Sequence, residues 1–194
     1  MARKYLILLI SFTLLVSCSD IFSTREPEDP NSDGDIYISE SVDELVRNLK
    51  TSLLSLDKIA YESLLVDSLN TDKSYSFSTQ AEDISQPNIF DDWGIDNEKL
   101  FLDGMKSSSS AFSDISFSLN DSYDESQDSL SIELDYSMSF TDTSSTVSIV
   151  KGVFTFEIIK IEGHFWYIEN WIDQYYALSV NQLSFSKLKE PYIY

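Results

Sequence analysis

The sequence is short of the residues that carry most enzyme chemistry. It has one cysteine, Cys18, and one histidine, His164, among 194 residues. A single cysteine excludes a disulfide within one chain, and a single histidine excludes a metal site built from several histidines. His164 follows the Glu162-Gly163 turn, a place typical of a surface residue rather than of a general base with an orienting partner. The motifs of serine hydrolases, zinc proteases, phosphate loops and dinucleotide-binding domains are all missing.

Positive charge is also scarce. The chain has 13 Lys and Arg against 33 Asp and Glu, a formal net charge of −20. Nucleic-acid binding depends largely on Lys and Arg contacts with phosphate, so a nucleic-acid partner is not expected. The same balance argues against electrostatic docking on anionic lipid and favours a solvated exterior over cation binding or basic partners. Aromatic residues make up 13% of the chain, which is too many for a disordered protein.

The only long apolar run lies at the N-terminus. Residues 5–16 follow Arg3 and Lys4 and match the length of a signal-peptide core, but they are too few to span a bilayer. The run ends in Leu15-Val16-Ser17-Cys18, which resembles the lipobox of bacterial lipoproteins. The open alternatives are a free buried cysteine or a chance cysteine behind an ordinary signal.

The lipobox resemblance implies how the N-terminus is processed. It implies removal of residues 1–17, a diacylglycerol and an acyl chain such as palmitate on Cys18, and a location in the bacterial cell envelope. Two or three acyl chains are enough for stable anchoring. Ser19 rather than Asp follows the cysteine, which favours the outer membrane under the sorting rule of many Gram-negative bacteria.

Residues 18–40 are rich in acids, Ser, Pro and Gly, and predict a flexible tether. Within it, residues 29–40 match the spacing of an EF-hand calcium loop, with Gly34 and Glu40 at the required positions. No amphipathic helix precedes the loop and Pro30 stiffens its second position. Calcium binding is therefore the less favoured interpretation, and no metal or other cofactor is predicted.

Helical spacing dominates the first half of the remaining chain. Ser41 and Glu44 form a capping box ahead of apolar residues that recur every three or four positions. Trp93 precedes another such segment, for which Asp96 is the expected cap. Helices are predicted over 41–56, 58–67 and 96–109, and a short strand over 74–79.

The second half alternates with the period of strands. Residues 130–140 give the clearest alternation of apolar and polar side chains, with Glu133 and Asp135 on the polar face. Residues 146–161 predict a long strand with a bulge near Gly152, and a tight turn connects it to 164–172. Residues 174–194 form an extension that the pattern does not place.

Helices followed by long antiparallel strands are typical of an α+β fold. The segments Asn48-Leu49 to Leu65, Tyr75-Ser76-Phe77, Trp93 and Gly163 to Trp171 are similar to those of the NTF2-like (cystatin-like) superfamily. This resemblance covers residues 41–173. It implies N-terminal helices packed on a curved antiparallel sheet as a cone, and a homodimer through the sheet as one option.

Enzymatic members of that superfamily use an Asp base or an Asp–His pair inside the cone. Here Asp57 and Glu62 flank a predicted helix bend, and surface positions are the simpler interpretation. Glu157 and Glu169 occur in facing strands among aromatic residues and are the acids most expected to reach a pocket. The candidate pocket residues are Trp93, Tyr136, Phe156, Glu157, Trp166, Glu169 and Trp171, although ordinary core packing is the simpler interpretation for several of the aromatic ones.

These observations favour a lipid-anchored envelope protein whose NTF2-like domain is a non-catalytic binding or scaffolding module for an unidentified protein or small apolar ligand. Two alternatives stay open. The first is a cavity enzyme of the isomerase or hydrolase type that uses a carboxylate base on a small apolar substrate. The second is a calcium-binding surface lipoprotein that uses residues 29–40.

Overall fold

The computed structural model describes residues 36–192, apart from 70, 87, 121 and 176–181. The predicted signal peptide, the lipobox-like segment with Cys18, most of the predicted tether and most of the calcium-loop pattern lie outside these residues. Among the described residues, no helix is long and apolar enough to cross a membrane.

The predicted helices are present, with changes at their ends. Helix α2 (Val42–Ser55) begins at the Ser41 cap, whose hydroxyl accepts from the Glu44 N–H. Helix α3 (Lys58–Glu62) is shorter than predicted, because Val66 donates to the Ile168 carbonyl and the chain there pairs with a strand.

Helix α4 (Ile95–Ser107) is capped by Gly94, not by Asp96 as the sequence suggested. The Asn97 side chain accepts from the Gly94 N–H, which satisfies a donor that would otherwise be left open at the helix start. The helix therefore begins closer to Trp93 than predicted. As a result, Glu98 falls in its first turn and points to the buried side.

One sheet contains the strands β1 (Ser76–Thr79), β2 (Ala111–Leu119), β3 (Ser129–Thr141), β4 (Val147–Ile161), β5 (Phe165–Gln174) and β6 (Gln182–Leu183). The spatial order is β1-β5-β4-β3-β2, and β6 pairs with the part of β4 that extends beyond β5. The sheet is mixed rather than purely antiparallel, because β1 runs parallel to β5 and β6 parallel to β4.

The long hairpins follow the predicted alternation. Leu130, Ile132, Leu134, Tyr136, Met138 and Phe140 are all buried, and the residues between them face the other side. Glu162 and Gly163 both have positive φ and form the tight turn between β4 and β5. Glu133 and Asp135 on β3 are exposed, so the opposite face of this strand is the interior.

The bulge lies elsewhere than predicted. The pairing of β3 with β4 is continuous through Gly152, whereas the pairing of β4 with β5 shifts between Glu157 and Ile158. Gly152 is explained by a close approach instead. A Cβ built there would lie 2.7 Å from the Tyr136 hydroxyl and 2.5 Å from the Gln174 carbonyl oxygen.

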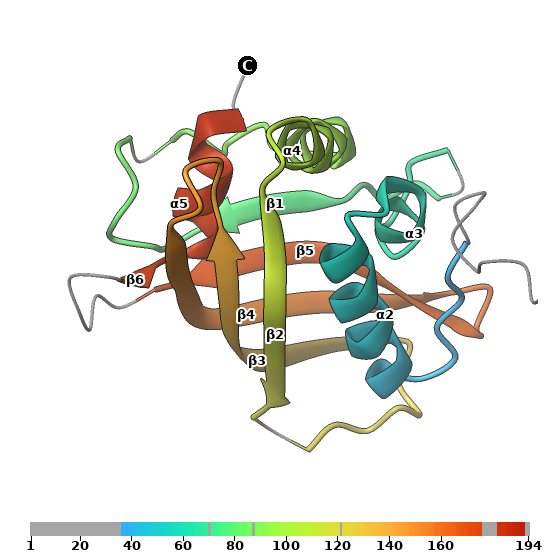
Figure 1. Cartoon of the computed structure of the whole chain (residues 1–194). Helices are drawn as coiled ribbons and strands as arrows, with labels where there is room; N and C mark the ends of the chain where they lie inside the picture. The colour runs from blue at the N-terminus through green and yellow to red at the C-terminus, as the bar shows by residue number, and fades with distance from the viewer. Residues whose placement is uncertain (1–35, 70, 87, 121, 176–181, 193–194) are drawn as a thin grey trace, which may run out of the picture. The chain divides into compact units, whose positions relative to one another are not determined.

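The helices cover one face of the sheet (Figure 1). Helix α2 packs against β2 and β5, while α4 and α5 (Phe185–Lys189) lie together at one end of the sheet. The chain then closes with a short 3₁₀ turn, η1 (Glu190–Tyr192), whose Tyr192 ring packs edge-on against Phe101 of α4. Tyr192, the last described residue, therefore packs against the core.

Candidate functional site

Most of the predicted pocket aromatics do face the interior. Trp93, Tyr136, Phe156 and Trp171 are each at most 3% exposed. Phe154 lies among them, with its ring stacked on Tyr136 at 3.8 Å and edge-on to Trp171 at 4.7 Å. Together they form the floor of the space between the sheet and the helices.

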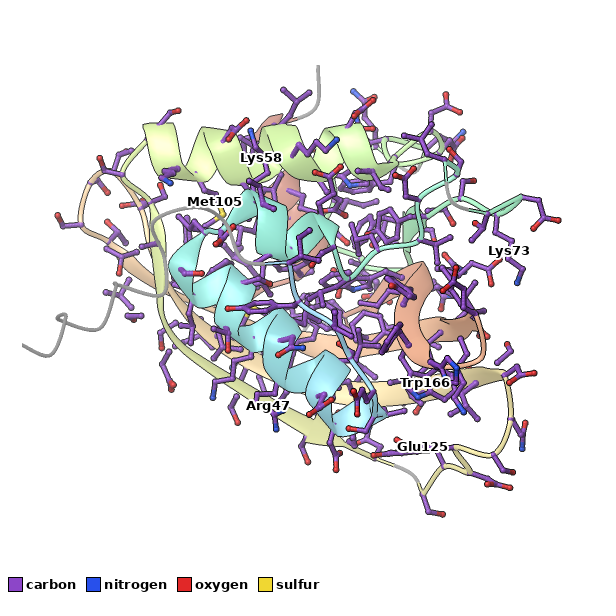
Figure 2. All side chains as sticks on the ribbon, turned by 90° about the vertical axis from the view of Figure 1, so that its right-hand side faces the viewer. Arg47, Lys58, Lys73, Met105, Glu125 and Trp166 are labelled. Carbon is purple, nitrogen blue, oxygen red and sulfur yellow. The ribbon has the colours of Figure 1, made fainter. Side chains whose placement is uncertain are left out.

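Trp166 is buried but belongs to another part of the structure. The Lys160 ammonium lies 4.8 Å from its ring centre and also donates to the Glu125 carbonyl. Figure 2 shows Trp166 near Glu125, far from Met105 of α4. Trp166 therefore contributes to the core at the opposite end from the other pocket candidates.

The two acids that were expected to reach the pocket lie outside it. Glu157 follows Phe156 on β4, so strand alternation turns it away from the interior, where it accepts from the Ser131 hydroxyl. Glu169 lies beside the register shift and pairs with Lys73 at 2.8 Å. The prediction is therefore wrong for both acids: alternation with the buried Phe156 turns Glu157 outward, and the bulge keeps Ile168 and Trp171 inside and places Glu169 outside.

The interior is occupied by side chains of the C-terminal segment, residues 182–192. Phe185, Leu188 and Lys189 of α5 are buried, the first and last completely. The Phe185 ring is stacked on Trp171 at 5.3 Å with an interplanar angle of 5°. It also meets the ring of Phe154 edge-on at 5.3 Å. The extension that the sequence left unplaced therefore packs on the floor of the cone.

A buried ion pair connects this segment to α4. The Lys189 ammonium lies 2.6 Å from Oε1 of Glu98, and the two side chains are 0% and 1% exposed. Three further donors converge on the same carboxylate. Oε1 accepts from the Tyr75 hydroxyl and the Trp93 indole N–H, and Oε2 accepts from the Tyr61 hydroxyl.

Aromatic rings surround the Lys189 ammonium. The ring centres of Phe77, Trp171, Trp93 and Phe101 lie 3.7, 4.9, 5.2 and 5.6 Å from Nζ. All four distances are within the range in which a ring quadrupole attracts a cation. We call these four rings together with Glu98 the cation cage.

A second buried carboxylate holds the start of α5. Oδ1 of Asp173 accepts from the Tyr136 hydroxyl at 2.7 Å, and Oδ2 accepts from the backbone N–H and the hydroxyl of Ser186, both at 2.6 Å. The Tyr136 hydroxyl also accepts from the Phe185 N–H. One oxygen of Asp173 therefore accepts from β3 and the other accepts from α5.

Burial changes the proton affinities of these groups. It raises the pKa of Asp173 to about 6, although the Ser186 and Tyr136 donors act in the opposite direction. It lowers the pKa of Lys189 to about 8, against the attraction of Glu98. The pKa values of Tyr61 and Tyr75 are well above the usual value, first through burial and then through the charge of Glu98.

The other polar residues singled out from the sequence lie at the surface. His164 is exposed beside its turn, as expected. Asp57 caps α3 by accepting from the Ile59 and Ala60 amides, and Glu62 pairs with Lys99. Among the residues described, no three His, Cys, Asp or Glu side chains are grouped closely enough to hold a metal ion.

Sequence reasoning missed Glu98, Asp173 and Lys189, yet each carries a signal. Glu98 lies on the same helix face as Phe101, Leu102 and Met105, at the spacing of buried positions. Asp173 is two residues after Trp171 and shares its side of β5. Lys189 follows Phe185 by four residues, which places it on the same face of α5.

Comparison with known proteins identifies the fold. No family model and no curated protein matches the sequence. A ketosteroid isomerase-like protein from Erwinia carotovora atroseptica SCRI1043 is similar in structure, with TM-score 0.50 and 11% identity over 74% of this chain and 96% of that one. A conserved protein from Planctomyces limnophilus DSM 3776 gives TM-score 0.52 and 12% identity over 69% and 91% of the two chains.

An NTF2-like protein of unknown function in nutrient uptake, from Rhodospirillum rubrum ATCC 11170, gives TM-score 0.48 and 12% identity over 68% of this chain and 95% of that one. The chain has the NTF2-like fold, with helices packed on a curved mixed sheet that does not close. At these identities the likeness establishes the fold and no activity.

Proposed function

We propose that this chain is a lipid-anchored cell-envelope protein whose NTF2-like domain is a non-catalytic binding or scaffolding module. The observation that carries the non-catalytic part is the occupied cone. In this fold a substrate would enter the space between the helices and the sheet. Here the side chains of Phe185 and Lys189, which are completely buried, occupy that space. The lipobox of the sequence supports the anchor.

A cavity enzyme is the second candidate, and one observation favours it. Asp173 is a buried acid on the cone wall with a raised pKa, as a carboxylate base would be. Its lone pairs, however, are directed at Ser186 and Tyr136. A base must reach the proton that it removes, so α5 would have to leave Asp173 in every catalytic cycle.

Hydrogen exchange of the full chain distinguishes the two candidates. For a non-catalytic module we expect the amides of α5 to exchange as slowly as those of β3 and β4 in the absence of ligand. Much faster exchange confined to α5 in the absence of ligand, with the sheet still protected, would show a cone that opens by itself and exposes Asp173, which favours the enzyme.

The anchor is tested by cell fractionation. In a Gram-negative host we expect the wild-type chain in the membrane fraction, released by detergent, and Cys18→Ala outside that fraction. Ser19→Asp is the matched variant, since it keeps the cysteine and is expected to move the protein from the outer to the inner membrane. A Cys18→Ala chain that stays membrane-bound, with an unmodified Cys18 in the wild type, contradicts the lipoprotein proposal.

A further inference from the structure

The cation cage belongs entirely to the body of the domain. Its members come from β1, the loop before α4, α4 itself and β5, and none comes from the C-terminal segment. Glu98 is oriented by Tyr61, Tyr75 and Trp93, which are also residues of the body. The domain therefore presents a carboxylate held by three donors among aromatic rings, and Lys189 is the group that occupies this arrangement.

Lys189 and Phe185 place an ammonium and an aromatic ring at a separation that a small amine can also provide. The Lys189 ammonium lies 4.8 Å from the ring centre of Phe185, and that ring is stacked on Trp171. An ammonium joined to an aromatic ring by two carbons has a similar separation, about 5 Å by ordinary bond lengths. Phe185 and Lys189 thus place in the cone the two recognition elements of an arylalkylamine.

We propose that the interior of the cone is a binding site for a primary arylalkylammonium compound, which takes the places of Lys189 and Phe185 when α5 is displaced. Glu98 neutralises the ammonium, and the rings of Phe77, Trp93 and Phe101 surround it. Trp171 stacks on the aromatic part of the ligand and Phe154 meets it edge-on, as the two rings now do with Phe185.

An acidic surface pocket lies beside the cage and shares Tyr75 with its surroundings. A surface pocket of about 530 Å³ is lined by Glu62, Asp67, Asp92 and Asp96, with Lys99 as its one basic residue. Tyr75 forms part of this pocket, and its hydroxyl donates to Glu98 at 2.5 Å. The acidic lining and the net charge of −20 both favour entry of a positively charged ligand.

The segment that must be displaced is small. Helix α5 has five residues, and β6 before it has two.

This inference rests on the proposed function, since it names the ligand class of the binding module. The test uses the full chain with Phe185→Ala and Lys189→Ala together, which removes both occupying groups and replaces no residue of the cage. Phenethylammonium is the probe, and 2-phenylethanol and n-butylammonium are the controls that lack the charge and the ring. Binding is followed by calorimetry and by the shift in unfolding temperature.

We expect phenethylammonium to bind this variant at least about tenfold more tightly than either control and than it binds the wild type, whose site is filled. Adding Glu98→Gln is expected to weaken binding at least about tenfold, because the charge partner is lost. In the wild type, the probe is expected to accelerate hydrogen exchange in α5 but not in β3 and β4.

Equal binding of phenethylammonium and 2-phenylethanol would overturn the proposal, as it would show an apolar cavity only. Failure of a folded variant to bind the amine would also overturn it, while leaving the anchored scaffold untouched, because fractionation and ligand-free exchange decide that separately. If the double variant does not fold, Lys189→Ala alone with n-butylammonium against n-butanol is judged by the same criterion.

Discussion

Lys189 and Glu98 are 91 residues apart in the sequence and form a buried ion pair with an N–O distance of 2.6 Å. This contact joins the last helix of the chain to α4 inside the cone. A buried ion pair adds little net stability, because the desolvation of both charges offsets their attraction. Its main effect is to fix where α5 lies, since either charge alone in this place would be unfavourable.

The first prediction concerns the coupling of these two charges. Lys189→Met and Glu98→Gln are each expected to lower the free energy of unfolding by about 3–5 kcal/mol, because each leaves one buried charge without its partner. The double variant is expected to lose less than the sum, with a coupling energy of at least about 1.5 kcal/mol. Urea denaturation followed by tryptophan fluorescence measures all four proteins.

The matched control is the exposed pair of Lys58 and Asp103, whose N–O distance of 2.7 Å is nearly the same. Lys58 lies at the surface beside α4 (Figure 2). The cycle of Lys58→Met and Asp103→Asn is expected to give a coupling energy below about 1 kcal/mol. Equal coupling in the two cycles would show that burial does not strengthen the interaction of Lys189 with Glu98.

The second prediction concerns pH. The pKa of Asp173 is about 6 in the folded protein and 3.8 in its ordinary state, so between these values the folded state binds more protons than the unfolded state. Stability from this group is therefore present at low pH and lost as the pH rises through 6. The advantage of the wild type over Asp173→Asn is expected to fall by about 1.5 kcal/mol between about pH 4.8 and about 6.8.

The measurement is the difference in the free energy of unfolding between the two proteins across that range. Comparing differences removes the constant cost of replacing the carboxylate and the titration of all other groups. A difference that stays flat, or that grows with pH, would show that Asp173 is ionised throughout in the folded state.

The sequence predicted the fold where the physics is local. Alternation in β3 and the Ser41 cap of α2 depend on neighbouring residues and were predicted correctly. The interior acids depend on distant contacts. A register shift in β5 decides that Glu169 is outside, and only the return of the C-terminal segment gives Glu98 its partner. Helical spacing indicates that Glu98 and Lys189 lie on buried faces, but no periodic pattern shows that they pair or where the register shifts.

The third prediction concerns the acids first expected in the pocket. Glu157→Gln and Glu169→Gln are each expected to change the free energy of unfolding by less than about 1 kcal/mol, because their partners Ser131 and Lys73 lie at the surface. Neither substitution should alter phenethylammonium binding in the background of Phe185→Ala and Lys189→Ala. A tenfold loss of binding caused by either substitution would show that the replaced acid does contribute to the binding site.

The last prediction concerns Gly152, which lies opposite Tyr136 in the pairing of β3 with β4. A Cβ there would come within 2.5 Å of the Gln174 carbonyl oxygen, and the backbone at this position is held by the adjoining β4–β5 pairing. Gly152→Ala is therefore expected to cost about 2–3 kcal/mol and to move Tyr136 away from Asp173. Gly94→Ala is the control, since its nearest neighbour would be 3.9 Å away and a loss below about 1 kcal/mol is expected. If the two variants are equally stable in urea denaturation, the close packing of Tyr136 over Gly152 does not determine the geometry of the cone floor.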